Sequence, residues 1–255
     1  MPEIKKHYRQ LVTLFLSLAL SSVVHAADVR VAVAANFTDT TRDLIAAFGA
    51  STGLEAVASY GSTGKLYAQI ENGAPFDVFL AADSRRPELI EESGQGVAGT
   101  RFTYARGKLA LWSPVPETFE DPKTWLKSGD FARLAIANPR TAPYGLAAQE
   151  VLTGLNLWED LQDRLVRGDS IAQTFQFVAT TNAQSGFVAL SQVRAWEEKG
   201  GSLWLIPQSY YSPINQQAIL LTRSENNGAA HKWLEFLRGD TARGIIEKFG
   251  YETEN

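Results

Sequence analysis

The sequence contains no cysteine among its 255 residues. This absence excludes disulfide bonds, thiol nucleophiles and thiolate metal sites, and it predicts no lipoprotein anchor. Histidine is scarce as well, because His7 and His25 lie within the first 26 residues and leave only His231 for the rest of the chain. A Ser–His–Asp triad would have to use His231, and no G-x-S-x-G nucleophile elbow is present. We therefore expect a protein that is not an enzyme.

The chain also lacks an excess of positive charge. It carries 24 Lys and Arg against 28 Asp and Glu, for a net charge of −4. Nucleic-acid binding depends on clustered Lys and Arg that neutralise phosphates, so we expect no nucleic-acid partner. The hydrophobic content of 45% is sufficient for a packed core in one large or two modest domains.

The only long apolar run lies near the N-terminus. Basic residues Lys5, Lys6 and Arg9 precede the apolar, serine-interrupted stretch Leu11–Val24, and Val24 and Ala26 place small residues at the usual peptidase positions. The run is too short and too polar to favour a spanning helix of about 20 residues. Residues 1–26 are therefore predicted to be a secretory signal peptide that is cleaved after Ala26, and the mature chain is expected in the periplasm.

The remaining chain alternates apolar strand-like runs with helical patterns. Leu44, Ile45 and Phe48 share one face of a helix predicted to end near Gly49, and Ile171, Phe175 and Val178 share a face of another, which Ser170 can cap. Short apolar runs without alternation are typical of parallel strands covered on both faces, so the predicted class is α/β. The candidate strands are Val29–Ala34, Leu54–Ser59, Asp77–Ala81, Lys108–Trp112, Arg133–Ala137, Gly186–Leu190, Ser202–Ile206 and Gln217–Thr222.

Small polar residues stand where four of the helices are expected to begin. They occur within Val31–Phe37, Ser59–Leu66, Pro143–Gly145 and Gly168–Ile171. Helix N-termini present unpaired N–H groups and a partial positive charge, and they attract anions. Taken singly, Asn36 and Thr63 could simply cap helices. Four such starts in one chain instead predict a site that binds an oxyanion and catalyses no reaction on it.

No long linker divides the chain, so two lobes would have to be joined by crossing strands. The candidate crossings are Tyr104–Lys108 and Asn215–Leu220. We expect one lobe to be formed by residues 27–107 and completed by residues 217–255, with residues 108–216 forming the other lobe.

Five segments, in order and spacing, carry a family resemblance. They are Ala34–Phe37, Gly61–Ile70, Gly73–Asp83, Ala137–Gly145 and Ser185–Leu190. The chain resembles the periplasmic molybdate-binding proteins of ABC importers across its whole mature length. This resemblance implies a two-lobed periplasmic binding-protein fold of type II, in which each lobe is a mixed, mostly parallel sheet flanked by helices and the ligand lies in the interlobe cleft.

The resemblance also implies the ligand contacts. Asn36 and Thr63 match side-chain donors, whereas Tyr144 and Ile171 match residues that donate through their backbone amides. Ala189 departs from the family, because some members place a ligand tyrosine at that position. Ser62 and Ala35 are therefore added to the expected site. A metal is expected at this site only as the molybdenum or tungsten of the oxyanion, which would be contacted by Asn36, Thr63, Tyr144 and Ile171.

The chemistry of these residues agrees with the expected ligand. Molybdate and tungstate carry no proton near neutral pH, so a selective site should offer donors and no acceptor. Phosphate keeps a proton and favours an acceptor, and the only carboxylates in or just after the four segments are Asp39 and Asp169. We expect Asp39 in the first turn of its helix, and Asp169 and Lys65 exposed to solvent. Sulfate is also unprotonated, so a sulfate-type oxyanion stays open as an alternative ligand.

Other functions fit less well. Gly61–Lys65 resembles part of a phosphate loop, but Ser59 stands in place of its first glycine and Leu66 in place of its hydroxyl residue. Adjacent Tyr210 and Tyr211 could bind ferric iron, or both rings could pack in the segment that leads back to the first lobe. A ligand-sensing regulatory domain shares the fold, but the predicted signal peptide and the missing DNA-binding segment argue against it.

The sequence thus predicts a periplasmic receptor that captures molybdate, and tungstate as well, and delivers it to the membrane permease of an ABC importer. We expect the receptor to be a monomer without a cofactor.

Overall fold

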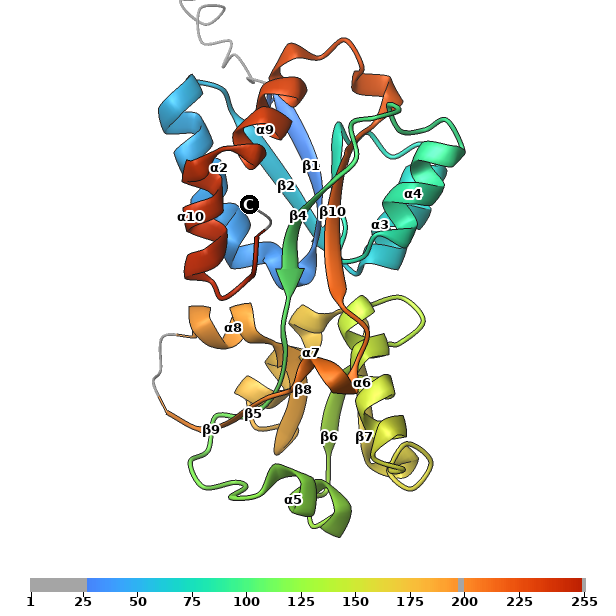
Figure 1. The fold of residues 1–255 in the computed structure, drawn as a ribbon, viewed down its shortest axis with the longest axis vertical. Helices are drawn as coiled ribbons and strands as arrows, with labels where there is room; N and C mark the ends of the chain where they lie inside the picture. The colour runs from blue at the N-terminus through green and yellow to red at the C-terminus, as the bar shows by residue number, and fades with distance from the viewer. Residues whose placement is uncertain (1–26, 197–199, 254–255) are drawn as a thin grey trace, which may run out of the picture.

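The computed structural model describes residues 27–196 and 200–253, and the predicted signal peptide lies outside these residues. The described chain forms two lobes stacked along the long axis of the molecule, and each lobe contains one five-stranded sheet (Figure 1). Within the described ranges, no helix has the length and apolar character needed to cross a membrane.

The first lobe is built on the sheet with strand order β2-β1-β3-β10-β4. Helices α2, α9 and α10 pack on one face of this sheet, and α3 and α4 pack on the other. The strands are β1 (Val29–Ala34), β2 (Ala56–Gly61), β3 (Val78–Leu80), β4 (Phe102–Gly107) and β10 (Ile214–Leu220). The helices are α2 (Thr38–Thr52), α3 (Thr63–Glu71), α4 (Arg85–Glu92), α9 (Gly228–Arg238) and α10 (Asp240–Lys248).

The second lobe has the strand order β7-β6-β8-β5-β9. Helix α6 contributes to the core on one face of the sheet, and α7 packs its Phe175 and Val178 against the other. The strands are β5 (Leu109–Ser113), β6 (Leu134–Ala137), β7 (Leu165–Gly168), β8 (Ser185–Ala189) and β9 (Ser202–Leu205). The helices are α5 (Pro122–Ser128), α6 (Pro143–Gly154), α7 (Ile171–Ala179) and α8 (Leu190–Ala195).

The chain runs directly from the first sheet into the second between β4 and β5, where Lys108 is the only intervening residue. It returns through the 3-10 turn Gln208–Tyr210 into β10, which pairs antiparallel with β4. Figure 1 shows β4 and β10 side by side where the two lobes meet. The two sheets are therefore joined by adjacent chain segments rather than by a loose linker.

The predicted α/β class is confirmed, but the sheets are less parallel than expected. Each sheet contains two parallel and two antiparallel pairings. The antiparallel pairings arise because β10 returns to the first sheet against the direction of β3, and because β5 enters the second sheet against the direction of β8.

Most predicted elements appear near their expected positions. Helix α2 continues past Gly49 to Thr52 and ends at Gly53, whose left-handed backbone (φ 70°) terminates the helix. Asp39 lies in the first turn of α2, and the Ser170 hydroxyl accepts a hydrogen bond from Gln173 N at the start of α7, both as predicted. Strand β4 was expected only as the crossing segment Tyr104–Lys108, and β7 was missed; both strands lie at sheet edges.

Candidate ligand-binding site between the lobes

The candidate site is formed by four helical segments that begin near the carboxyl ends of strands or in the loops that follow them. Strand β1 runs into a 3-10 turn at Ala35–Phe37, β2 leads into α3 at Thr63, and β7 leads into α7 at Ile171. Helix α6 begins at Pro143 after the loop that follows β6. The first N–H groups of a helix have no intrahelical carbonyl to bond, so each start supplies donors to whatever lies beyond it.

Hydrogen bonds bring these starts together across the boundary between the lobes. Gly64 N donates to Thr141 O at 2.9 Å, which joins the start of α3 to the loop before α6. Ser191 Oγ in the second lobe donates to Asn36 O in the first at 3.0 Å. The lobes are thus in direct contact, and the structure is that of a closed arrangement.

All six residues predicted for the site are buried at this boundary. Their exposed fractions are Asn36 3%, Ser62 3%, Thr63 1%, Tyr144 1%, Ile171 3% and Ala35 5%. Ala35 of the first lobe belongs to the same buried cluster as Tyr144 and Ile171 of the second. A ligand held among these groups would be shielded from bulk water.

Two hydroxyl groups at the start of α3 are able to donate. Thr63 Oγ1 accepts a hydrogen bond from Ala82 N at 3.1 Å, which leaves the hydroxyl hydrogen of Thr63 free. Ser62 Oγ is buried and has no hydrogen-bond partner within the described part of the chain. A buried unpartnered hydroxyl is costly in a folded protein, so a ligand acceptor at Ser62 would recover that energy.

Asn36 is engaged differently from the sequence expectation. Its Nδ2 group donates to Gln216 Oε1 at 2.7 Å and to Tyr251 Oη at 3.0 Å. An amide group carries two hydrogens, so both side-chain donors of Asn36 are already used. The backbone N–H of Asn36, within the first turn after β1, is the donor that is left for an anion.

Gln216, Tyr251 and Ser191 were not predicted from the sequence. They are 180, 215 and 155 residues from Asn36 in the chain, respectively, yet each hydrogen-bonds to it. Gln216 lies in the polar stretch Asn215–Gln217 at the start of β10, and no sequence motif marks any of the three.

The hydroxyl of Tyr144 packs against Gly107, the last residue of β4, where the chain crosses from one lobe to the other. A Cβ atom on Gly107 would collide with Tyr144 Oη and would lie 3.0 Å from Gln216 Nε2. Neither Tyr144 Oη nor Gln216 Nε2 has a hydrogen-bond partner among the residues that the structure describes. Burial raises the pKa of the Tyr144 hydroxyl well above its usual value, so this group stays neutral.

The carboxylates at or near the described part of this boundary have partners of their own, among them Asp39 with Arg42 and Glu150 with Ser212 N. The buried carboxylate of Asp77 lies at the start of β3, where it accepts from Arg30 N, at the end of the sheet opposite Asn36. Asp83 follows β3 but is paired with Arg86. Asp169 and Lys65 are exposed as predicted, and they form an unpredicted 2.8 Å salt bridge between the lobes.

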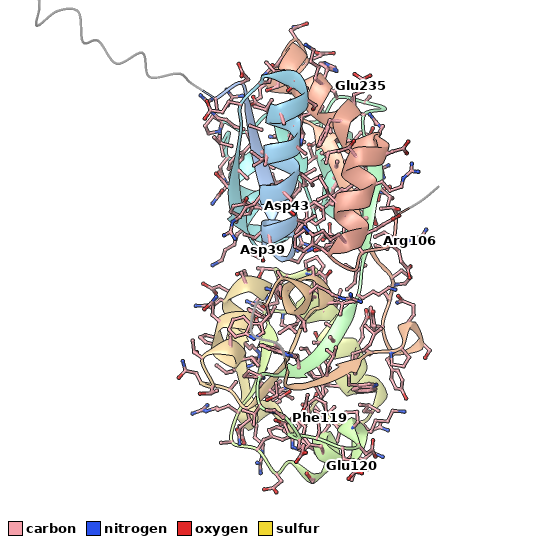
Figure 2. All side chains as sticks on the ribbon, turned by 90° about the vertical axis from the view of Figure 1, so that its left-hand side faces the viewer. Asp39, Asp43, Arg106, Phe119, Glu120 and Glu235 are labelled. Atoms are coloured by element: carbon pink, nitrogen blue, oxygen red, sulfur yellow. The ribbon has the colours of Figure 1, made fainter. Side chains whose placement is uncertain are left out.

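Two grooves open on the boundary. One has a volume of about 390 Å³ between α2 and helices α7 and α8, and Ala35 and Thr38 line it together with Ala172 and Gln192. The other, of about 120 Å³, lies between Ala82 and Pro143. In the side view of Figure 2, Asp39 lies on the edge of the first lobe that faces the second lobe.

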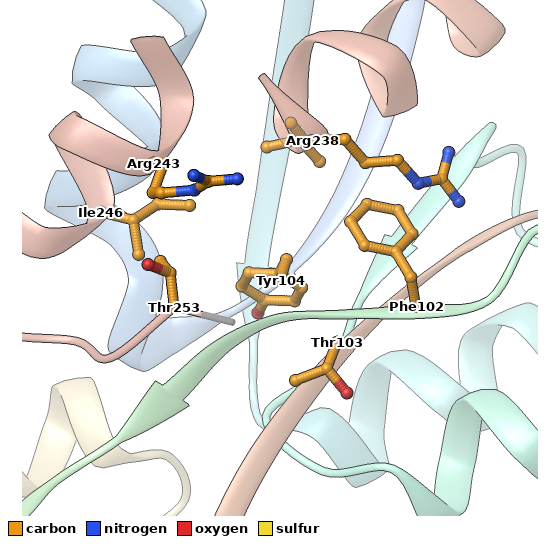
Figure 3. Close-up of a pocket in the computed structure, with 8 residues that line it drawn as sticks. Phe102, Thr103, Tyr104, Arg238, Arg243, Ile246 and Thr253 are labelled. Atoms are coloured by element: carbon orange, nitrogen blue, oxygen red, sulfur yellow. The ribbon is translucent and has the colours of Figure 1, made fainter. Parts of the chain in front are cut away.

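A separate pocket of about 110 Å³ lies within the first lobe, between β4 and helices α9 and α10 (Figure 3). Tyr104 and Thr253 line it, and the guanidinium of Arg238 stacks on the ring of Phe102 at 3.9 Å. This pocket shares none of the predicted ligand residues.

The adjacent tyrosines Tyr210 and Tyr211 already make other contacts. Tyr211 Oη accepts a hydrogen bond from Leu109 N at 3.1 Å, and the Lys123 ammonium lies 4.9 Å from the centre of the Tyr210 ring. A cation beside Tyr210 disfavours ferric iron there. The described residues also contain no group of three His, Asp or Glu side chains suited to hold a metal ion.

The two joined lobes and the buried donor-rich boundary between them define a two-lobed ligand-binding protein. Residues 29–252 match the family model described as bacterial extracellular solute-binding protein, and the chain belongs to this family.

Individual relatives agree with this assignment. The chain is 50% identical to a protein of Azotobacter vinelandii named molybdate-binding protein ModA, over 91% of this chain and 92% of the relative. It is 46% identical to a protein of the same name from Rhodobacter capsulatus, over 94% of each chain. The solved Azotobacter vinelandii periplasmic molybdate-binding protein superposes with a TM-score of 0.86 at 40% identity, covering 89% of this chain and all of that one.

Proposed function

We propose that this chain is a periplasmic receptor that captures molybdate, and tungstate as well, between its lobes and delivers it to the permease of an ABC importer. The observation that carries the proposal is the buried meeting point of four helix starts, which offers N–H and hydroxyl donors without a free carboxylate. The names of the relatives from two organisms support the same ligand.

The donor set explains the choice of ligand class. A fully deprotonated tetrahedral dianion has only acceptor oxygens, so a cage of donors satisfies it completely. The hydroxyls of Ser62 and Thr63 and the N–H groups of Ala35, Asn36, Tyr144 and Ile171 form the proposed cage. A protonated phosphate would place its O–H against another donor, which is unfavourable at a buried site.

We further propose that residues 27–107 with 217–255 act as one lobe and residues 108–216 as the other. Ligand capture would close them, since contacts such as Gly64 N to Thr141 O exist only when the lobes meet. The closed surface would be the one that the permease recognises. The receptor is proposed to act as a monomer and to catalyse no reaction.

Titration calorimetry of the mature protein tests the proposed ligand. Molybdate and tungstate should each bind at one site per chain, and phosphate should not bind. Binding of ferric iron without binding of molybdate would instead assign the protein to metal capture. Mass spectrometry of the exported protein should find Ala27 at the N-terminus.

A further inference from the structure

We propose that Tyr251 is a positioning residue for ligand capture, whose hydroxyl holds the Asn36 turn in its binding conformation and links it to Ser191 of the opposite lobe. This inference rests on the proposed function, and it assigns a role at the ligand site to the C-terminal segment that follows α10.

The hydroxyl of Tyr251 lies at the centre of a buried polar cluster. It is 2.8 Å from Asn36 O, 2.8 Å from Ser191 Oγ and 3.0 Å from Asn36 Nδ2. One arrangement uses each hydroxyl hydrogen once: Tyr251 donates to Ser191 Oγ and accepts from the Asn36 amide, while Ser191 donates to the Asn36 carbonyl. The carbonyl and the side chain of Asn36 are thereby both held in place, which restrains the turn that carries its backbone N–H.

The cluster is shielded from solvent on all sides. The exposed fractions are 5% for Tyr251, 3% for Asn36 and 4% for Ser191. Burial raises the pKa of the Tyr251 hydroxyl above its usual value, although hydrogen bonds from its neighbours partly offset this effect. The hydroxyl therefore stays protonated and able to donate throughout the physiological pH range.

Tyr251 is anchored to the first lobe independently of the ligand. The segment after α10 turns back near the lobe boundary and runs beside β4 (Figure 1). Arg106 N donates to Glu252 O at 2.7 Å, and Glu252 N donates to Arg106 O at 3.1 Å. The Tyr251 ring also packs edge-on against Phe37, with 5.0 Å between the ring centres. Thr253, two residues later, lines the pocket beside β4 (Figure 3).

The contact with Ser191, in contrast, depends on closure of the lobes. Ser191 belongs to α8, which packs at the end of the second sheet. Gly250 brings the C-terminal segment close to the same helix, because a Cβ atom there would lie 3.1 Å from Leu190 Cδ2. Tyr251 and Asn36 thus move with one lobe and Ser191 with the other. Their shared hydrogen bonds stabilise the closed, ligand-holding state and not the open one.

This difference predicts an effect on ligand release. A hydrogen bond present only in the closed state slows reopening, so its loss should raise the dissociation rate and leave the association rate nearly unchanged. Removal of one neutral hydrogen bond should weaken binding about five- to tenfold.

The test measures molybdate binding and release by stopped-flow tryptophan fluorescence and calorimetry, using the full mature chain. Tyr251→Phe keeps the ring against Phe37 and removes only the hydroxyl, and Ser191→Ala removes the partner on the other lobe. Tyr67→Phe is the matched control, since that hydroxyl contacts Glu71 at 2.7 Å on the exposed surface of α3. We expect both test variants to release molybdate about five- to tenfold faster. The double variant should release molybdate at about the rate of the faster single variant, because both substitutions remove the same hydrogen bond. The control should release molybdate at the parental rate.

Parental dissociation rates in both test variants would overturn the positioning role while leaving molybdate binding intact. A lower melting temperature of the unliganded Tyr251→Phe protein, with molybdate release unchanged, would likewise reduce Tyr251 to a structural residue. If Tyr251→Phe does not fold, Ser191→Ala decides by itself. A parent protein that does not bind molybdate would remove the proposed function, and the positioning role would be lost with it.

Discussion

Gly64 and Thr141 join the two lobes through backbone atoms alone, with Gly64 N donating to Thr141 O at 2.9 Å. A Cβ atom on Gly64 would lie 3.1 Å from both Cα and O of Thr141 and 3.0 Å from Arg86 Nη2. The lack of a side chain at Gly64 therefore sets how closely the start of α3 approaches the loop before α6.

Gly64→Ala should consequently weaken molybdate binding by several-fold. The added methyl group must push the lobes apart by a few tenths of an ångström, whereas in the separated lobes only the flexible end of Arg86 has to move. Gly244→Ala in α10 is the control, since no atom lies within 4 Å of its added Cβ, and it should increase stability by about 0.4–1 kcal/mol. Calorimetry checks the affinity and thermal melting checks the stability. An unchanged affinity for Gly64→Ala would argue against tight closure around the ligand.

Thr63→Val should impair both binding and stability. The valine keeps the shape of the side chain but removes the acceptor for Ala82 N and the hydroxyl proposed to donate to the ligand. Leaving a buried N–H unsatisfied costs about 1–3 kcal/mol, which denaturant unfolding of the unliganded protein would measure. Thr63→Ser keeps the hydroxyl and should remain close to the parent in both respects. Equal molybdate affinity for the valine and serine variants would remove Thr63 from the donor set.

Tyr144→Phe should bind molybdate like the parent. The proposed donor at this position is the backbone N–H, which the substitution keeps, and the lost hydroxyl has no hydrogen-bond partner among the described residues. Loss of a buried unpartnered hydroxyl should also leave the free energy of unfolding unchanged or slightly higher. A strong loss of molybdate affinity would show that the hydroxyl itself contacts the ligand.

The buried tyrosines predict how stability depends on alkaline pH. Burial raises the pKa of Tyr104, Tyr144 and Tyr251 in the folded chain. The unfolded chain ionises these hydroxyls near about pH 10 while the folded chain keeps them neutral. Their contribution is therefore complete below about pH 10 and is lost as the pH rises further, by up to about 1.4 kcal/mol per tyrosine and pH unit. Denaturant unfolding measured from about pH 8 to about pH 11 should show this decline in the free energy of unfolding.

Tyr144→Phe provides the control for the alkaline experiment. It removes one of the three groups, so the free energy of unfolding should fall less steeply with pH than in the parent. Identical slopes for the two proteins would mean that Tyr144 ionises as readily in the folded chain as in the unfolded one.

The sequence predicted the parts of the fold that depend on local pattern. Apolar runs such as Val29–Ala34 and the helical face of Ile171, Phe175 and Val178 appear where expected. Strand β4 was anticipated only in its second half, as the crossing Tyr104–Lys108, because Phe102–Gly107 mixes aromatic, polar and charged residues, as an edge strand can. Strand β7 was missed because it has only four residues, one of them Arg167.

The site was predictable only as far as its motifs. The helix starts at Asn36, Thr63, Tyr144 and Ile171 lie together at the lobe boundary because each follows a strand or loop that points there. The partners of Asn36 were not predictable, since Gln216, Ser191 and Tyr251 reach it from distant parts of the chain. For the same reason, the sequence could not show that the Asn36 amide is already hydrogen-bonded, nor that Lys65 pairs with Asp169 across the boundary.

The lobe boundary is proposed to bind a fully deprotonated oxyanion through donors alone. The most direct measurement is the stability of the mature protein with molybdate, compared with phosphate at the same concentration. At about 1,000 times its dissociation constant, molybdate should add roughly 4 kcal/mol to the free energy of unfolding, because the unfolded chain has no assembled donor cage. Phosphate should add almost nothing. Equal stabilisation by the two ions, or none by molybdate, would contradict the account.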